Sequence, residues 1–325
     1  MPSRVVFLSW PPGEITGGIK FTFRCAEILQ ENGIAAVVAT DRAQGATWFS
    51  SSASVIDISE VRRNEDVLVF PENHHGLLEA FAGEKNPKIV FCQNPYGAHR
   101  GLGRRSDYGD FGVTHIIGLG AHATRFCRRR FPRLSVLDVQ CFIDHKLFCP
   151  PPTKRLQIAF IPKKRPLEAM FIQDFVRHAL SPQFRDIPWI RIENMSENQV
   201  ARVMQDSAIF LSLSRFEAYG FNILEAMLCG CVVVGFTGTG ALEFATAANG
   251  FFVAEDDCMA CAESLKDAIQ CVVGGGKAYQ DLINEGVATG MRYQRNRFAQ
   301  RFMDAWKQIG TDLKLDLGLL HSAAN

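Results

Sequence analysis

The sequence has no long hydrophobic run. Its first apolar stretch, within MPSRVVFLSWPPGE, holds only about six residues, fewer than the about 7–15 of a secretory signal or the roughly twenty of a bilayer span. We therefore expect a cytoplasmic protein that at most works at the inner face of a membrane.

The sequence also lacks a strong charge imbalance and a cysteine framework. Its net charge is +1, with 47% hydrophobic and 21% charged residues, which is typical of a globular chain and indicates no particular partner. The ten cysteines lie mostly in apolar segments, where a thiol packs as a small hydrophobe, so we expect no disulfide framework. The one C-x-x-C motif, Cys258 to Cys261, has no second pair at zinc spacing, so we predict no metal site.

Other binding motifs are missing as well. No G-x-G-x-x-G follows the first apolar run, since PPGEITGG does not match it, and this argues against a dinucleotide-dependent dehydrogenase. No basic stretch is interleaved with aromatic residues, so we expect no nucleic-acid partner. No Asp-x-Asp motif is present, which argues against a transferase that holds its substrate through a metal.

Short apolar runs that alternate with helical periodicity dominate the rest of the sequence. Runs such as RVVFLSW, KIVFCQ, QIAFIP and CVVVGF predict strands buried on both faces, and IKFTFRCAEILQENG and CAESLKDAIQCV predict crossover helices. This alternation predicts an α/β protein with parallel sheets. A length of 325 residues suggests two domains, because a domain averages roughly 150 residues.

A proline-rich break, CPPPTKR, separates the two strand-and-helix arrays. We therefore predict two doubly wound, Rossmann-like domains, 1–150 and 151–325, that face a cleft. The stretch RYQRNRFAQRFMDAWKQIG predicts an amphipathic helix that belongs to the second domain. Ligands of such sheets bind at the carboxyl ends of the strands.

Two acids, Glu217 and Glu225, stand in the most informative stretch, SRFEAYGFNILEAMLCGCVVVGF. A strand ends near Ser214 and a helix is predicted to begin near Tyr219 to Phe221, so the first helical amides are available to an anion or polar ligand. Gly220 lets that ligand approach the backbone closely. Glu217 would lie in the turn and Glu225 about one helical turn inside, a separation that suits hydroxyls on two sugar rings. The alternative is a capping acid and a solvated helix residue.

The run SLSRFEAYGFNILEAMLCGCVVVGFTGTGALEF resembles the donor-binding signature of glycosyltransferase family 4, retaining enzymes of the GT-B fold. Weaker similarities, PPGEITGGIKF, CFIDHKLFCPP and NGFFVAEDD, extend over both domains. The resemblance implies that the first domain binds the acceptor and the second a nucleotide-sugar donor, which is a substrate, so no cofactor is expected.

The resemblance also implies roles for individual residues. Glu217 would hold hydroxyls of the donor sugar, and Glu225 would accept from the ribose. The donor-facing backbone would include Gly17 and Gly18 in the first domain and Ala218, Tyr219, Gly220 and Phe221 in the second. The family's phosphate-binding Arg and Lys are replaced here by a turn with candidates Lys163, Lys164 and Arg165, and the alternative is a solvated basic turn.

The catalytic candidates are Glu217, Lys164 and one histidine. Family members place a histidine of the first domain near the donor sugar, and His99 is our candidate, with His115 as the alternative. Asn94 and Tyr96 follow the strand KIVFCQ and are further cleft candidates. Arginine clusters around Arg104 and Arg128 would face an anionic or lipid-linked acceptor, or simply water.

The predicted reaction is a metal-independent, retaining hexosyl transfer to a glycan or lipid-linked acceptor, as in polysaccharide biosynthesis. Retention implies that the acceptor attacks from the face that the diphosphate leaves. A GT-B-fold sugar-nucleotide epimerase is one alternative, and a catalytically silent glycan-binding member is another. The intact Glu217, Gly220 and Glu225 count against the silent alternative.

Overall fold

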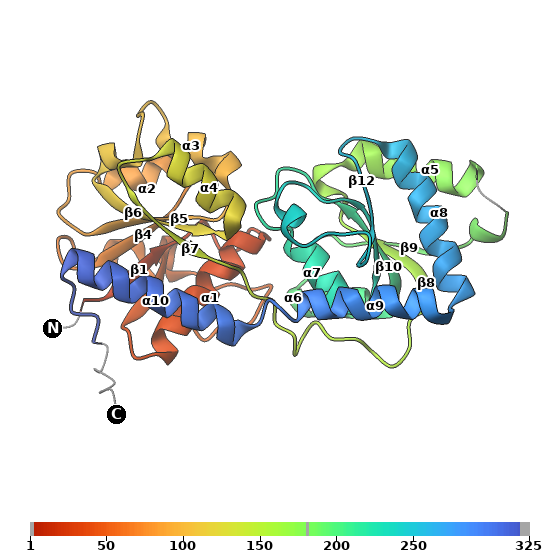
Figure 1. Cartoon of the computed structure of the whole chain (residues 1–325). Coiled ribbons are helices and arrows are strands. Elements are labelled where there is room, and N and C mark those ends of the chain that lie inside the picture. Colours follow the sequence, from red (N-terminus) through yellow and green to blue (C-terminus); the bar gives the residue numbers. More distant parts are fainter. Residues whose placement is uncertain (1–2, 180–181, 319–325) are drawn as a thin grey trace. The chain divides into compact units, whose positions relative to one another are not determined.

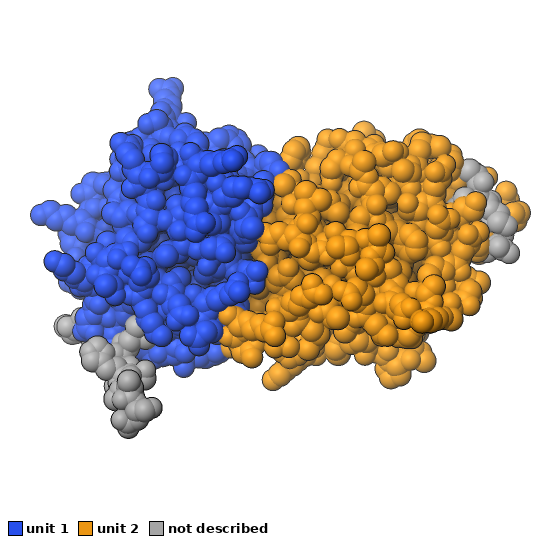
Figure 2. Space-filling view, in the orientation of Figure 1, with its two compact units in different colours: residues 1–140, 298–325 blue, residues 141–297 orange. Residues whose placement is uncertain are grey.

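The computed structural model describes residues 3–179 and 182–318, and these form two compact units (Figure 2). Unit 1 consists of residues 1–140 together with 298–325, and unit 2 of residues 141–297. Each unit has one fully parallel sheet with helices on both faces (Figure 1). The predicted α/β class with two doubly wound sheets is therefore confirmed.

Unit 1 is built on a seven-stranded sheet with the order β3-β2-β1-β4-β5-β6-β7. Its strands are β1 (Val5–Leu8), β2 (Ala36–Thr40), β3 (Val55–Asp57), β4 (Val67–Pro71), β5 (Lys88–Cys92), β6 (Val113–Leu119) and β7 (Ser135–Val139). Its helices are α1 (Gly17–Glu31), α2 (His75–Ala80), α3 (Ala98–Leu102), α4 (Gly120–Arg130) and most of α10 (Arg295–Leu313). The central strands β1, β4 and β5 are buried and almost entirely apolar, because helices cover both faces of the sheet.

Unit 2 is built on a five-stranded sheet with the order β12-β11-β10-β8-β9. Its strands are β8 (Arg155–Phe160), β9 (Trp189–Arg191), β10 (Ser207–Leu213), β11 (Val232–Phe236) and β12 (Phe251–Val253). Its helices are α5 (Pro166–Ala179), α6 (Glu197–Asp206), α7 (Phe221–Leu228), α8 (Cys258–Gly274) and α9 (Gly276–Gly290). Helices α5 and α8 pack together on one face of this sheet, and α7 packs on α9 on the other.

The division between the units differs from the predicted one in two places. The chain passes into unit 2 at Cys141, before the prolines, because residues 141–150 already pack there: Ile143 N donates to Tyr293 O (2.9 Å), and Gln205 Nε2 donates to Leu147 O (2.9 Å). The proline-rich break is thus part of unit 2 and not the linker between domains. The predicted second domain also reaches to residue 325, of which 319–325 lie outside the described residues.

Helix α10 belongs mainly to unit 1, and not to the second domain as predicted. Its apolar stripe is buried there, with Phe298 packing edge-on against Phe21 (5.1 Å between ring centroids) and Trp306 against Phe7 (6.3 Å). His115 in β6 adds a polar contact, 3.2 Å from the Asp312 carboxylate. The amphipathic character was therefore predicted correctly, while the sheet that it covers was not.

Both sheets have a point where the strand order reverses. In unit 1 this switch point lies between β1 and β4, and in unit 2 between β8 and β10. Crossover helices leave in opposite directions from such a pair of strands, which opens a crevice at their carboxyl ends. Among the residues that the structure describes, no helix is both long and apolar enough to cross a membrane.

Candidate functional site

The turn between β10 and α7 lies at the switch point of unit 2 and carries the predicted donor signature. Helix α7 begins at Phe221, as predicted, and Gly220 at its N-cap has φ 77°, a left-handed conformation that glycine adopts without strain. A Cβ on Gly220 would also lie 3.2 Å from Ala241 Cβ. The amides of the first helical turn lack partners within the helix, and the helix dipole makes this end positive.

Glu217 and Lys164 form an ion pair at the carboxyl edge of this sheet. The Glu217 Oε1 atom lies 2.6 Å from Lys164 Nζ, and the two side chains are 25% and 39% exposed. Lys164 comes from the turn after β8, so the pair joins the two strands of the switch point. A half-exposed pair of opposite charges can exchange partners with a ligand that offers both hydroxyls and phosphate oxygens.

Glu225 and Asn222 lie inside α7. The Glu225 side chain is buried, with 7% exposed, so it is not the solvated helix residue of the alternative interpretation. Asn222, in the first turn, has a buried Oδ1 without a hydrogen-bond partner among the described residues. Sequence reasoning missed Asn222. A buried acceptor without a partner is costly, so this oxygen is suited to a ligand hydroxyl or amide.

The turn is held in shape by a second loop. Gly240 N donates to Glu217 O (3.0 Å), and a Cβ on Gly240 would lie 2.2 Å from the backbone of Ala218 and Tyr219. Tyr219 is itself buried and packs edge-on against Tyr293, 5.8 Å away, and burial raises the pKa of Tyr293 to about 12. Of the predicted donor residues, Ala218 and Tyr219 therefore present backbone to the edge, because their side chains are in the core.

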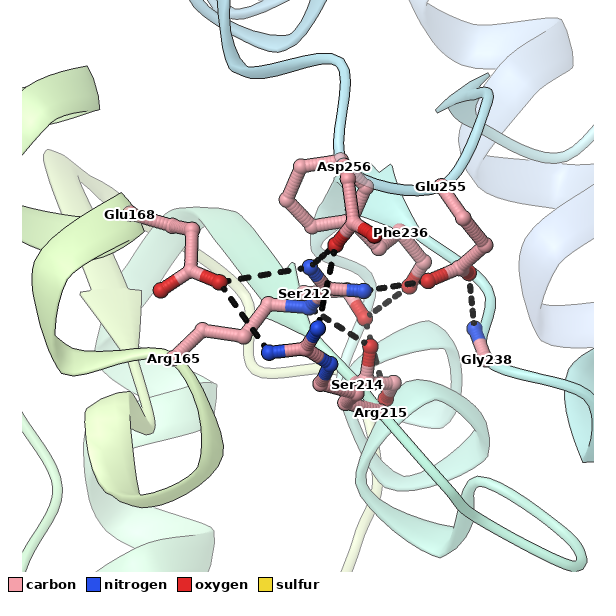
Figure 3. A network of polar contacts seen from close by, with 9 residues as sticks. All are labelled: Arg165, Glu168, Ser212, Ser214, Arg215, Phe236, Gly238, Glu255 and Asp256. Atoms are coloured by element: carbon pink, nitrogen blue, oxygen red, sulfur yellow. Dashed lines mark hydrogen bonds and ion pairs between the residues drawn. The ribbon is translucent and has the colours of Figure 1, made fainter.

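Arg165 has surroundings that differ from those predicted. Its guanidinium is completely buried: Nε donates to Ser214 O (3.1 Å), and the terminal nitrogens pair with Asp256 and Glu255 (Figure 3). Its hydrogen bond to Asp256 lowers the pKa of that carboxyl. The prediction made Arg165 a donor-phosphate ligand, but its nitrogens face carboxylates and a carbonyl, and the exposed cations of this turn are Lys163 and Lys164.

The predicted residues of the first domain lie in unit 1. Gly17 and Gly18 form the first turn of α1, where Thr16 Oγ1 accepts from Ile19 N (3.4 Å), and His99 is an exposed residue of α3. The alternative histidine, His115, is 4% exposed and pairs with α10. The structure thus groups the unit 2 candidates at one sheet edge and leaves Gly17, Gly18 and both histidines in another unit.

A second group of polar and aromatic side chains lies at the switch point of unit 1, and sequence reasoning missed most of it. Trp10, after β1, stacks on His74 (4.0 Å between centroids), and its Nε1 donates to Asn73 Oδ1 (2.8 Å). Glu72, after β4, is 4% exposed and accepts from Gln93 N (3.0 Å), and burial raises its pKa to about 7.

Gln93 links this group to the predicted glycine pair. Its Nε2 donates to Gly18 O (3.1 Å) and to Thr22 Oγ1 (3.0 Å), while its buried Oε1 has no hydrogen-bond partner in the described part of the chain. Nearby, Asn94 accepts from Tyr96 N (3.2 Å), and the exposed Tyr96 ring stacks on His122 (5.8 Å). These residues give the edge a polar but largely uncharged character.

The remaining candidates are less specific. Arg105 pairs with Glu79 (2.7 Å) and Arg133 with Asp107 (3.4 Å), while Arg104 and Arg128 are exposed. Cys258 is the first residue of α8. Within residues 3–179 and 182–318, no three His, Cys, Asp or Glu side chains are grouped to hold a metal ion.

Comparison with known proteins identifies the family. Residues 190–287 match a family model described as "Glycosyl transferases group 1". An alpha-1,6-glucosyltransferase of Actinobacillus pleuropneumoniae serotype 7 (strain AP76) is 30% identical over 264 residues, which are 79% of this chain and 78% of that protein. The chain belongs to the glycosyltransferases.

Solved structures agree on the fold of this glycosyltransferase. Sucrose-phosphate synthase from Thermosynechococcus elongatus has a TM-score of 0.69 at 12% identity, covering 95% of this chain and 100% of that one. HepE of Anabaena in complex with UDP-glucose has a TM-score of 0.66 at 13% identity, covering 94% and 99%. The chain is thus a glycosyltransferase with the GT-B fold, and this part of the resemblance is confirmed.

Proposed function

We propose that this glycosyltransferase moves a hexosyl group from a nucleotide sugar to a hydroxyl of a glycan or lipid-linked acceptor, with retention of configuration. The observation that carries the proposal is the Glu217–Lys164 pair beside the start of α7, with Glu225 buried one turn further along. Such a site offers carboxylates for hydroxyls, and a cation with helix amides for phosphates.

Each residue of the unit 2 edge has a role in this proposal. Glu225 accepts from the ribose, and Glu217 accepts from hydroxyls of the sugar. Lys164, assisted by the exposed Lys163, neutralises the departing diphosphate together with the start of α7. As charge develops on the phosphate, Lys164 moves from Glu217 to the leaving group, since a dianion attracts it more strongly than one carboxylate. The backbone of Gly17, Gly18 and Ala218 to Phe221, and the His99 ring, remain predicted donor contacts.

UDP-glucose is the first donor to test. The curated relative is named as an alpha-1,6-glucosyltransferase, and one similar structure is described as a complex with UDP-glucose. Because UDP-glucose carries glucose in α-linkage, an α-linked product corresponds to retention. The α-linkage in the name of this relative supports attack from the face that the diphosphate leaves. Such attack requires no protein nucleophile.

Several finer features of the proposal rest on the sequence. Lys164 and the positive end of α7 supply the charge that a metal would otherwise provide, so we propose metal-independent transfer. The exposed Arg104 and Arg128 of unit 1 favour an anionic or lipid-linked acceptor, reached from the cytoplasm at a membrane face. Polysaccharide biosynthesis is the setting in which such acceptors are extended.

Calorimetric titration with UDP, GDP and ADP, followed by product analysis with the matching nucleotide sugars, tests the proposal. We expect one nucleoside diphosphate to bind, and an NMR spectrum of the product to show an α-anomeric proton. A 2-epimer of the donor formed without acceptor would identify an epimerase instead. Binding of glycans without any turnover would identify a silent member, and a β-linked product would exclude retention.

A further inference from the structure

The loops that follow four strands of unit 2 meet at Arg165. Arg165 itself follows β8, Ser214 and Arg215 follow β10, Gly238 follows β11, and Glu255 and Asp256 follow β12 (Figure 3). These strands are neighbours in the order β12-β11-β10-β8, so their carboxyl ends share one edge. One buried guanidinium therefore contacts, directly or through one residue, the loops that follow these four strands.

The hydrogen bonds around Arg165 form a closed ring through the donor turn. Arg165 Nε donates to Ser214 O (3.1 Å), three residues before Glu217. Glu217 O accepts from Gly240 N (3.0 Å), and two residues earlier Gly238 N donates to Glu255 Oε1 (2.9 Å). The other oxygen of Glu255 pairs with Arg165 and closes the ring. A shift of Arg165 would thus move both ends of the segment that carries Glu217.

Arg165 also lies next in the chain to the partner of Glu217. Lys164, its neighbour in the chain, pairs with the Glu217 carboxylate at 2.6 Å. The guanidinium is further fixed by the Phe236 ring, whose centroid lies 4.2 Å from Cζ, and by Glu168 at 3.5 Å. The planar guanidinium group has five N–H donors and can therefore hold a carbonyl and two carboxylates at once. An ammonium group cannot do so with the same geometry.

The charges around Arg165 suit a buried structural contact and not a phosphate-binding site. The carboxylates of Glu168, Glu255 and Asp256 outnumber the guanidinium groups of Arg165 and Arg215. A diphosphate placed on this cluster would meet an excess of negative charge and would have to displace the carboxylates.

We propose that Arg165 is a positioning residue of the transferase: it holds the Lys164–Glu217 pair in place by tying four strand-end loops together, and it does not touch the donor phosphates. This inference rests on the proposed function, because it concerns the site at which that function places the nucleotide sugar. Removal of the Arg165 guanidinium should therefore impair turnover more than it impairs binding of the bare nucleotide.

The decisive experiment changes the acids and leaves Arg165 in place. Asp256 has φ 66°, a conformation that asparagine tolerates, and glutamine at 255 can still accept from Gly238 N. We expect the double variant Glu255→Gln, Asp256→Asn to lower kcat by about 100-fold, since small misplacements of catalytic groups have effects of this size. UDP affinity should be unchanged or lower. If Arg165 were a phosphate ligand, loss of the competing acids would raise UDP affinity, and that result, or an unchanged kcat, overturns the proposal.

A second pair of variants tests the guanidinium geometry of Arg165. Arg165→Lys keeps the charge and loses the geometry, so we expect a fall in kcat close to that of Arg165→Met. Recovery of activity by lysine would mean that charge alone matters and would overturn the proposal. Arg292→Lys is the matched control: Arg292 forms an exposed pair with Glu285 (3.2 Å), and we expect no change there. If the Arg165 variants do not fold, the acid variants still decide the question.

The two proposals fail in different ways. A wild-type chain that binds no nucleoside diphosphate and transfers no sugar would overturn the proposed function, and the inference about Arg165 with it. A wild-type chain that transfers sugar while the acid variants work equally well would overturn the inference alone.

Discussion

The carboxyl edges of the two sheets carry opposite chemistry although they are built in the same way. At the unit 2 switch point, the polar side chains are charged and paired, with Lys164 on Glu217 and Arg165 on Glu255. At the unit 1 switch point, Trp10 stacks on His74, and Gln93 supplies amide groups. The carboxyl group there, Glu72, is buried, and its pKa lies at about 7.

This difference indicates that topology places a ligand site and that side chains decide what it binds. Paired charges with helix amides suit an anion such as a nucleoside diphosphate. Aromatic faces and amides suit the sugar rings and hydroxyls of a glycan, which an acceptor presents whether or not it also carries a charge. We therefore propose that the donor binds at unit 2 and the acceptor at unit 1, and the following predictions test this assignment.

The largest effects are expected at the charged edge. Glu217→Ala should lower sugar transfer by roughly 100-fold or more, a loss typical of a preorganised group at the reacting centre. Its effect on binding of bare nucleoside diphosphate should be small. Glu225→Ala should instead weaken binding of the bare nucleotide by about 1–3 kcal/mol, the usual scale for removal of a charged hydrogen-bond partner.

Calorimetric titration of both variants with the nucleotide and its sugar conjugate separates these roles. Equal effects of the two substitutions on bare nucleotide would show that our assignment of ribose and sugar is wrong. A purely structural role for both acids would appear as a lower melting temperature without ligand, with no separation between nucleotide and nucleotide-sugar affinity.

The next effect is a dependence of stability on pH that comes from the uncharged edge. The pKa of Glu72 is raised from 4.5 to about 7 by burial, so the folded state holds this proton more tightly than the unfolded chain. The resulting stability is fully present below pH 4.5 and is lost as the pH rises through about 7, a change of about 3 kcal/mol.

Urea unfolding of Glu72→Gln at several pH values between 4 and 8 measures this change. Glutamine can accept from Gln93 N without ionising, so the variant should lose the decline in stability towards pH 8. Glu79→Gln is the control, since the hydrogen bond from Arg105 lowers the pKa of Glu79, a shift of the opposite sign. If Glu72→Gln keeps the full decline, Glu72 is not its source.

A smaller effect is expected from Trp10. Trp10→Ala removes an aromatic face at the unit 1 edge, so we expect KM for the acceptor to rise by about 3- to 10-fold. UDP affinity should stay at the wild-type value. Trp10→Phe keeps a ring while it loses the hydrogen bond to Asn73, and it should retain most of the acceptor affinity. Weakened UDP binding in either Trp10 variant would contradict the assignment of donor and acceptor to separate sheet edges.

The smallest expected effect is that of chelation. If Lys164 and the start of α7 neutralise the diphosphate, transfer in excess EDTA should proceed at the untreated rate. A rate that falls in EDTA and recovers only with added magnesium or manganese would show that the charged edge is incomplete without a metal.

Most of the fold could be predicted from the sequence because buried parallel strands are continuous apolar runs. The predicted runs RVVFLSW, KIVFCQ, QIAFIP and CVVVGF coincide with β1, β5, β8 and β11, and α7 begins within the predicted range. The partners of Arg165 could not be found in this way, because Glu255 lies 90 residues away and only the strand order brings them together. The shared carboxyl edge of parallel strands could have placed the acids after FFVA on the same side of the sheet as Arg165, but not in contact with it, because β11 and β10 lie between β12 and β8.

The group at the unit 1 edge was missed for a related reason. Trp10 and His74 are 64 residues apart, and neither belongs to a motif, so only the pairing of β1 with β4 brings the strand ends that precede them to one edge. The sheet covered by α10 was missed because an apolar stripe indicates that a helix is buried but does not identify the sheet against which it packs. Sequence patterns thus determined the elements, while the contacts between distant elements required the structure.

The return of α10 to unit 1 has a consequence for how the protein is made. Ribosomes add roughly 5–20 residues per second, from the N-terminus onward, and domains tend to fold as they emerge. Unit 2, a continuous segment of residues 141–297, is complete before Phe298 and Trp306 are synthesised. Until then Phe7 and Phe21 lack the helix that covers them. The half of the molecule that is translated first is therefore the last that can finish folding, and for that interval it offers chaperones an uncovered apolar surface.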